Sequence, residues 1–67
     1  MGIKYDYISV EQRYPEHNQH VQIYFKCEGE TRVIRGLFTM FGGKKEFNSY
    51  GSVIPNVVGW LPYGNNS

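Results

Sequence analysis

The residues best suited to chemistry in this chain are two histidines and a single cysteine. His17 and His20 are close enough in sequence that, on a helical turn, their rings could share a metal ion, with Cys27 as a conceivable third ligand. Loop histidines are more often solvated surface groups, however, and Cys27 falls in phase with the apolar residues of an alternating run. We therefore interpret Cys27 as an inert thiol in the core and predict neither a metal site nor a cofactor.

The remaining polar residues do not form a recognisable catalytic group. The six acidic residues are scattered, with no pair placed for acid–base catalysis. Ser9, Ser49 and Ser52 lack the context of a nucleophile elbow. The segment Gly42-Gly43-Lys44-Lys45 lacks both the spacing and the trailing Ser or Thr of a phosphate-binding loop. The sequence therefore predicts a protein that is not an enzyme.

The clearest structural signal is the alternation from His20 to Cys27. The odd-numbered residues of this run are apolar, whereas the even-numbered ones are polar or tyrosine, which is the period of a strand with one buried face. Glu28-Gly29-Glu30 predicts a turn, and the apolar-rich run from Arg32 to Phe41 is the expected return strand of a hairpin. Alternation is less regular there, so Gly36 predicts a bulge or sharp bend.

Shorter strands are predicted on both sides of this hairpin. They cover Lys4–Val10, Lys44–Tyr50 and Val57–Pro62. The segment Glu11–Asn18 lacks helical spacing and predicts a loop that could contain one helical turn from Pro15. Gly42-Gly43 predicts a second tight hairpin. Trp60 is expected in the core, where its indole N–H needs a hydrogen-bond acceptor.

About five strands without a long helix predict an all-β fold, either a small, strongly bent antiparallel sheet or an SH3-like barrel. The barrel is the first choice. An open sheet paired with a second copy of the chain is the main competitor, since pairing would also hide the sheet edges.

The length and charge of the chain limit the classes of protein to which it can belong. Sixty-seven residues predict a single domain over residues 1–63, followed by a disordered tail at 64–67. The net charge of +1 is far from the basic balance of a dedicated duplex-binding protein. No apolar run is long enough for a membrane span, and the first residues open no signal peptide. We therefore expect a cytoplasmic protein that does not interact with membranes.

Aromatic residues are the unusual feature of the composition, with six Tyr, four Phe and one Trp. Tyrosine brings a large contact area at low rotamer cost, and together with arginine it is typical of interface hot spots. The candidate partner contacts are Tyr5, Tyr14, Tyr24, Arg35, Tyr50 and Tyr63. A second interpretation is single-stranded nucleic-acid binding, with bases stacked on aromatic side chains. Its candidate residues are Lys26, Arg32, Arg35, Lys44 and Lys45, but neighbouring glutamates dilute their positive field and make this interpretation less favoured.

Three segments carry a resemblance to a known family. They are Tyr7–Glu16, with the sequence Y-I-S-V-E-Q-R-Y-P-E, followed by Val21–Tyr24 and Val57–Pro62. Together they resemble a family of small uncharacterised phage and prophage domains, whose members have W-I-S-V-x-x-R-L-P, V-L-V-Y and V-x-H-W-M-P-L. This chain departs at Tyr7, Tyr14, Gly59 and Leu61, and Gly59 replaces a histidine. The resemblance implies a phage or prophage origin and a small β fold, with no known activity.

These observations favour a non-enzymatic binding module. By analogy with other small phage proteins, we expect it to inhibit or redirect a host protein, such as a defence factor, by steric occlusion. Two alternatives remain open besides this hypothesis. One is the nucleic-acid-binding barrel, and the other is a self-assembling structural phage component that forms homo-oligomers.

Overall fold

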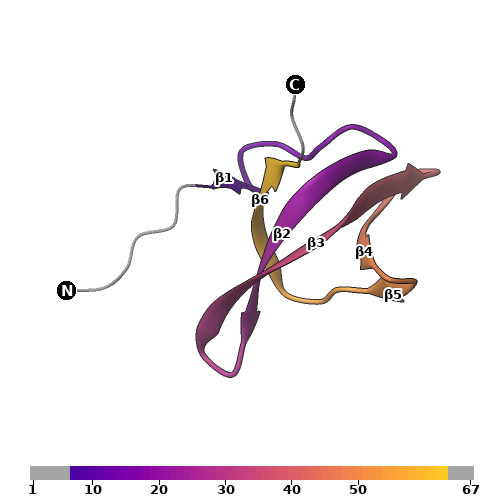
Figure 1. The fold of residues 1–67 in the computed structure, drawn as a ribbon. Helices are drawn as coiled ribbons and strands as arrows, with labels where there is room; N and C mark the ends of the chain where they lie inside the picture. Colours follow the sequence, from indigo (N-terminus) through magenta and orange to yellow (C-terminus); the bar gives the residue numbers. More distant parts are fainter. Residues whose placement is uncertain (1–6, 64–67) are drawn as a thin grey trace.

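The computed structural model describes residues 7–63, which form one antiparallel sheet of six strands and contain no helix (Figure 1). The strands are β1 (Ile8–Ser9), β2 (Gln19–Cys27), β3 (Glu30–Phe41), β4 (Lys44–Ser49), β5 (Ser52–Val53) and β6 (Val57–Pro62). Their order across the sheet is β1-β6-β2-β3-β4-β5, so the C-terminal strand lies beside the central β2. The predicted tail at 64–67 and the first part of the predicted strand Lys4–Val10 lie outside the described residues.

The sheet is not closed into a barrel, so the first choice among the two predicted architectures is wrong and the bent sheet is confirmed. The two outermost strands, β1 and β5, have two residues each and pair only with β6 and β4, respectively. Strands this short offer too few backbone groups to complete a ladder across the gap between them. The chain instead returns from β5 to β6 through an irregular segment, residues 54–56.

Three two-residue turns connect the consecutive strands from β2 to β5. Both residues of each turn have positive φ: Glu28 (52°) and Gly29 (80°), Gly42 (57°) and Gly43 (86°), and Tyr50 (51°) and Gly51 (81°). Positive φ at both positions is the geometry of type I′ turns, whose twist matches that of the flanking strands. The first two turns confirm the predicted hairpins, and the third adds a hairpin where only the end of a strand was expected.

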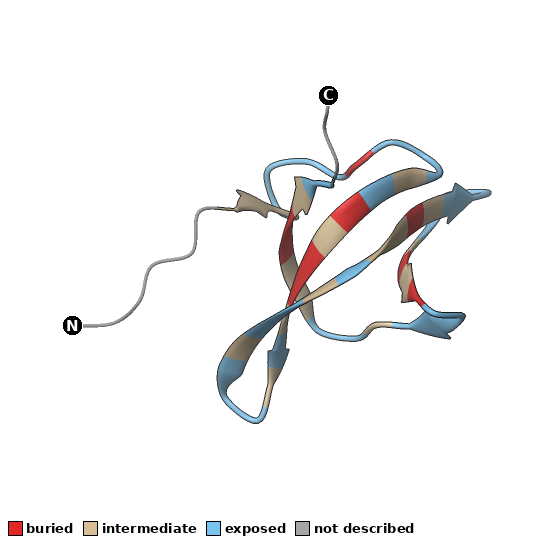
Figure 2. Ribbon diagram, in the orientation of Figure 1, coloured by how far each residue is buried: buried red, intermediate tan, exposed pale blue. Residues whose placement is uncertain are grey.

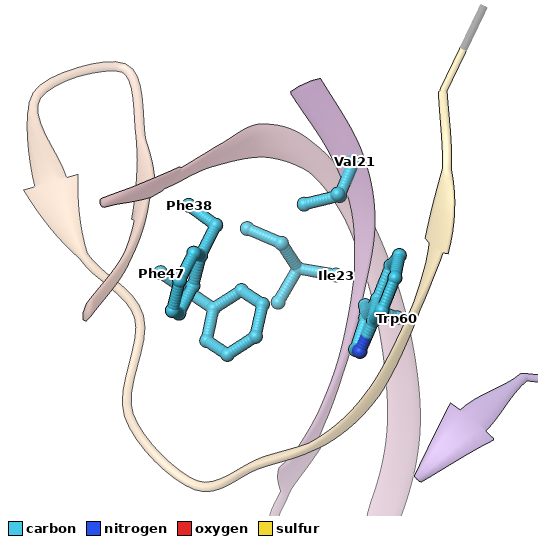
Figure 3. Close-up of a cluster of buried hydrophobic side chains, with 5 residues drawn as sticks. All are labelled: Val21, Ile23, Phe38, Phe47 and Trp60. Carbon is cyan, nitrogen blue, oxygen red and sulfur yellow. The ribbon is translucent and has the colours of Figure 1, made fainter. Parts of the chain in front are cut away.

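The core lies on one face of the sheet, which we call the inner face. Val21 and Ile23 from β2, Phe38 from β3, Phe47 from β4 and Trp60 from β6 converge there and are buried (Figure 3). The Trp60 Nε1–H donates to the carbonyl oxygen of Arg13 over 3.0 Å. This contact confirms that Trp60 is a core residue with a partner for its indole N–H.

The predicted bulge at Gly36 is wrong. Gly36 pairs directly with Val21 without a shift of register, and the irregularity lies instead between Tyr24 and Phe25, where β2 pairs with β6. Gly36 is needed for another reason: a Cβ atom there would collide with the backbone carbonyl of Asn48 and with the Ile23 side chain. The glycine therefore allows β4 to approach β3 closely above the core.

Two further local expectations are corrected. The loop between β1 and β2 does not form the predicted helical turn from Pro15. The Gln19 N–H closes a turn onto the Glu16 carbonyl over 3.0 Å, but Asn18 in that turn has a φ of 65°, which is outside the helical region. Cys27 is half-buried at the tip of the β2–β3 hairpin and lies outside the core. The hairpin extends past β6, whose pairing with β2 ends at Phe25, and past β4, whose pairing with β3 begins at Leu37. Within the described residues no third strand pairs with the hairpin at Cys27, and its tip is largely exposed (Figure 2).

Candidate partner-binding surface

The face of the sheet opposite the core, which we call the outer face, is covered by the chain itself over β2 and β6. The Tyr7 ring stacks on the Tyr24 ring with 4.9 Å between their centroids. Gly59 makes this possible, because a Cβ atom at that position would overlap the Tyr7 ring. Tyr24, one of the predicted contact residues, is only 9% exposed and therefore offers little surface to a partner. We call Tyr7, Tyr24 and Gly59 the covered half of the outer face.

The other half of the outer face, over β3 and β4, contains an open hollow of about 710 Å³. Residues of β3 alternate between the two faces, so Arg35, Leu37 and Phe41 point outward while Phe38 supports the core. The wall of the hollow includes His20, Arg35, Leu37, Phe41, Tyr50 and Tyr63. We refer to these six residues as the outer hollow. Its volume is within the range of small-molecule sites, although the hollow is open to solvent.

Arg35 contacts two tyrosines of the outer hollow, Tyr50 and Tyr63. Its Nη1 group donates to the Tyr63 hydroxyl, and its guanidinium carbon is 5.0 Å from the centre of the Tyr63 ring. This hydrogen bond is the main cause of a pKa of Arg35 above its ordinary value, and a hydrogen bond with Tyr50 acts in the same direction. The arginine is therefore held in place as a permanent positive charge.

Different elements bring the two tyrosines to Arg35. Tyr63 follows β6, and its backbone N–H donates to the His20 carbonyl over 3.1 Å, which holds Tyr63 against β2. Tyr50 occupies the first position of the β4–β5 turn, where its side chain is 85% exposed. Three of the predicted partner contacts, Arg35, Tyr50 and Tyr63, thus come together in the structure.

The remaining predicted contacts lie elsewhere. Tyr14 belongs to the inner face, where its ring centroid is 5.7 Å from that of Phe38 and 6.3 Å from that of Phe47. It is 42% exposed and covers one end of the core rather than the outer hollow. Tyr5 lies outside the described residues.

The predicted nucleic-acid residues do not form one surface. Alternation along the strands places Lys26, Arg35 and Lys44 on the outer face, and the other two, Arg32 and Lys45, on the inner side. Arg32 pairs with Glu30 at 3.6 Å and Lys44 with Glu46 at 3.5 Å. The Lys45 ammonium lies 5.3 Å from the centre of the Tyr14 ring. Of the five candidates, only Arg35 lines the outer hollow.

The histidines have separate roles in the structure. His17 Nδ1 accepts a hydrogen bond from the Met40 N–H over 3.0 Å, and its ring meets the Phe41 ring edge-on at 4.7 Å between centroids. His20, by contrast, lines the outer hollow. Across residues 7–63 there is no group of three or more His, Cys, Asp or Glu residues that could hold a metal ion.

Leu37, Phe41 and His20 belong to the outer hollow but were not among the predicted contacts. The signal that could have identified them is the strand period, because Arg35, Leu37 and Phe41 share one face if the phase of β3 continues through Gly36. His20 pairs with Leu37 across the β2–β3 ladder and so falls on the same face.

Comparisons with protein-family models, with curated proteins and with solved structures found no match to this chain. Within residues 7–63, no helix has the length and hydropathy required to cross a membrane. The chemistry of the outer hollow is therefore the basis for a functional proposal.

Proposed function

We propose that the protein is a small non-enzymatic module that binds another protein through the outer hollow. The observation that carries this proposal is the convergence of Arg35, Tyr50 and Tyr63 around an open, largely apolar depression. Tyrosine and arginine are enriched in the residues that dominate binding energy at interfaces. Phe41 adds a large apolar side chain that is 68% exposed, although the His17 ring meets it edge-on.

The proposed partner is a host protein in the cytoplasm. The resemblance to phage and prophage domains supports this part of the proposal, since small phage proteins without catalytic groups commonly act by occupying a surface of a host factor. The rigid sheet would present the outer hollow, and binding would inhibit or redirect the partner by steric occlusion. Nucleic-acid binding has weaker support, because the basic side chains are divided between two faces and two of them are paired with glutamates.

The test is affinity capture from a lysate of the bacterial host, with nuclease treatment and identification of the retained proteins by mass spectrometry. The baits are the unaltered protein, the double variant Arg35→Ala with Tyr50→Asn, and the control Arg32→Gln. Arg32 is a matched control, since it is also an exposed arginine of β3 but points to the other face. We expect the same host protein on the unaltered bait and on the control, and its loss from the double variant.

Other outcomes contradict the proposal in distinct ways. Equal capture by the double variant would place the interface outside the outer hollow. Capture that disappears with nuclease would favour the nucleic-acid alternative. Retention of nothing except further copies of the chain, together with a stable oligomer in solution, would favour a structural phage component.

A further inference from the structure

Arg35 is a cation without an acidic partner in the part of the chain that the structure describes. The two ion pairs found there belong to Arg32 with Glu30 and to Lys44 with Glu46. Arg35 contacts tyrosine hydroxyls instead, which orient the guanidinium without neutralising it. A guanidinium has five N–H donors, so about three remain after two tyrosine contacts, enough for the two parallel hydrogen bonds that a carboxylate accepts.

An apolar surface begins next to this charge. Leu37 is the next residue of β3 on the outer face after Arg35, and Phe41 lies further along the same face. Side chains two positions apart on a strand are separated by about 6.6 Å. A ligand in extended conformation has the same repeat, so one that lies along β3 can place a carboxylate on Arg35 and an apolar side chain on Leu37 at the same time.

The unpaired edge of β3 indicates that the ligand of the outer hollow is a polypeptide segment. β4 pairs with β3 only from Leu37 to Phe41, and within the described residues no strand lies beside residues 32–34 on that side. A sheet edge without a neighbouring strand is a template for an added strand of a partner, which aligns alternate side chains with pockets on the sheet. This open edge ends at Arg35, whose carbonyl oxygen accepts a hydrogen bond from Ser49 Oγ over 2.8 Å, so a segment that follows the edge must pass onto the outer face there.

We infer that the outer hollow receives an extended segment of the partner protein in which an acidic residue lies two positions from an apolar one. The carboxylate binds the Arg35 guanidinium next to Tyr50 and Tyr63, and the apolar side chain packs on Leu37. This inference rests on the proposed function and defines the chemistry of the segment bound at that site.

Three capped pentapeptides test the inference in titrations followed by two-dimensional ¹⁵N NMR of the full chain. The first is Gly-Phe-Ser-Glu-Gly, in which the acid and the aromatic residue are two positions apart. The second replaces Glu by Gln, and the third, Gly-Phe-Glu-Ser-Gly, makes the two residues adjacent. The first peptide is expected to shift the amide signals of Leu37, Thr39 and Tyr63, and the other two should bind about tenfold more weakly, as expected for loss of one charge-assisted contact.

Variants assign the effect to Arg35. Arg35→Gln should bind the Glu and Gln peptides equally, whereas Arg32→Gln should keep the tenfold preference. Equal affinity of the unaltered protein for these two peptides, no shift at millimolar peptide, or shifts confined to other surfaces would each overturn the inference. Equal shifts with inorganic phosphate alone would also overturn it, since they would indicate a general anion site.

The two proposals can fail separately. If host-protein capture depends on Arg35 and Tyr50 but the Glu and Gln peptides bind equally, the binding function stands and the acidic segment is wrong. If the peptides bind as expected but capture is unchanged in the double variant, the hollow recognises acidic segments and the captured partner uses another surface.

Discussion

The two halves of the outer face are both lined by tyrosines, yet the chain closes one and leaves the other open. In the covered half, Tyr7 lies on Tyr24 and fills the space that Gly59 leaves. In the outer hollow, Tyr50 and Tyr63 both contact the Arg35 guanidinium, and Phe41 in the same hollow stays accessible. The difference shows that aromatic content alone does not predict which rings are exposed; what matters is whether another segment of the same chain covers them.

The two halves are also expected to differ in what their residues contribute, with the covered half contributing to the stability of the fold and the outer hollow to the proposed binding. Residues of the covered half contact one another and hold β1 against β6, so changes there should affect the free energy of unfolding. The tyrosines and arginine of the outer hollow contact mainly each other at the surface, and surface contacts of this kind contribute little to stability. Substitutions in the two halves should therefore have opposite consequences for folding and for partner binding.

The largest effect is expected at Gly36, which lies beneath the outer hollow. In Gly36→Ala, the new methyl group meets the backbone carbonyl of Asn48 and the Ile23 side chain, and the backbone group cannot move without shifting β4. We expect a loss of about 3 kcal/mol in the free energy of unfolding, measured by urea denaturation. A loss below about 0.5 kcal/mol would show that β4 is not held against β3 as tightly as described.

A smaller loss of stability is expected from Gly59→Ala, which should displace Tyr7 from the covered half. The added Cβ overlaps the Tyr7 ring and crowds the Ile8 carbonyl, so Tyr7 must leave Tyr24. The expected cost is about 1–3 kcal/mol. The control is a double-mutant cycle with Tyr7→Ala, in which Gly59→Ala should cost less than half as much because the ring is already absent. Simple additivity of the two changes would contradict the stacking of Tyr7 over Gly59.

Tyr63→Phe tests whether a residue of the outer hollow affects binding without affecting stability. The variant keeps the ring against Arg35 but removes the hydroxyl that accepts its hydrogen bond. The urea midpoint should be nearly unchanged, because the pair is exposed. Affinity for the glutamate pentapeptide should fall about threefold, since the guanidinium is less well oriented. A marked loss of stability would instead show that the Tyr63 hydroxyl helps to stabilise the fold.

The strands were largely predictable, because they depend on local signals. Alternation from His20 to Cys27 and the glycines of two turns identified β2, β3 and β4 with their main hairpins. The outer hollow was only partly predictable. Adjacent apolar residues in β3 suggested a change of phase at Gly36, whereas Val33 is simply an exposed apolar residue and the phase continues. Without a continuous phase, the pattern gave no reason to place Leu37 and Phe41 on the same face as Arg35.

Neither the open shape of the sheet nor the burial of Tyr24 could be predicted from local sequence patterns. The sheet stays open because β1 pairs with β6, and β5 with β4, over only two residues each. The length of these pairings depends on how the strands are arranged in space. The burial of Tyr24 likewise depends on Tyr7, which is distant in sequence and reaches it only because β1 pairs with β6 beside β2. Tertiary contacts of this kind have no signature in a single strand.

The smallest expected effect on stability, and the sharpest separation of the two halves, comes from Tyr50→Asn. Tyr50 has a φ of 51° in a type I′ turn and precedes Gly51, and Asn-Gly is the pair this turn favours. The free energy of unfolding should stay constant or rise by about 0.5 kcal/mol. Capture of the host protein should nevertheless fall, because the ring that flanks Arg35 is gone. Unchanged capture by this well-folded variant would remove Tyr50 from the interface and confine binding to the part of the hollow between Tyr63 and Leu37.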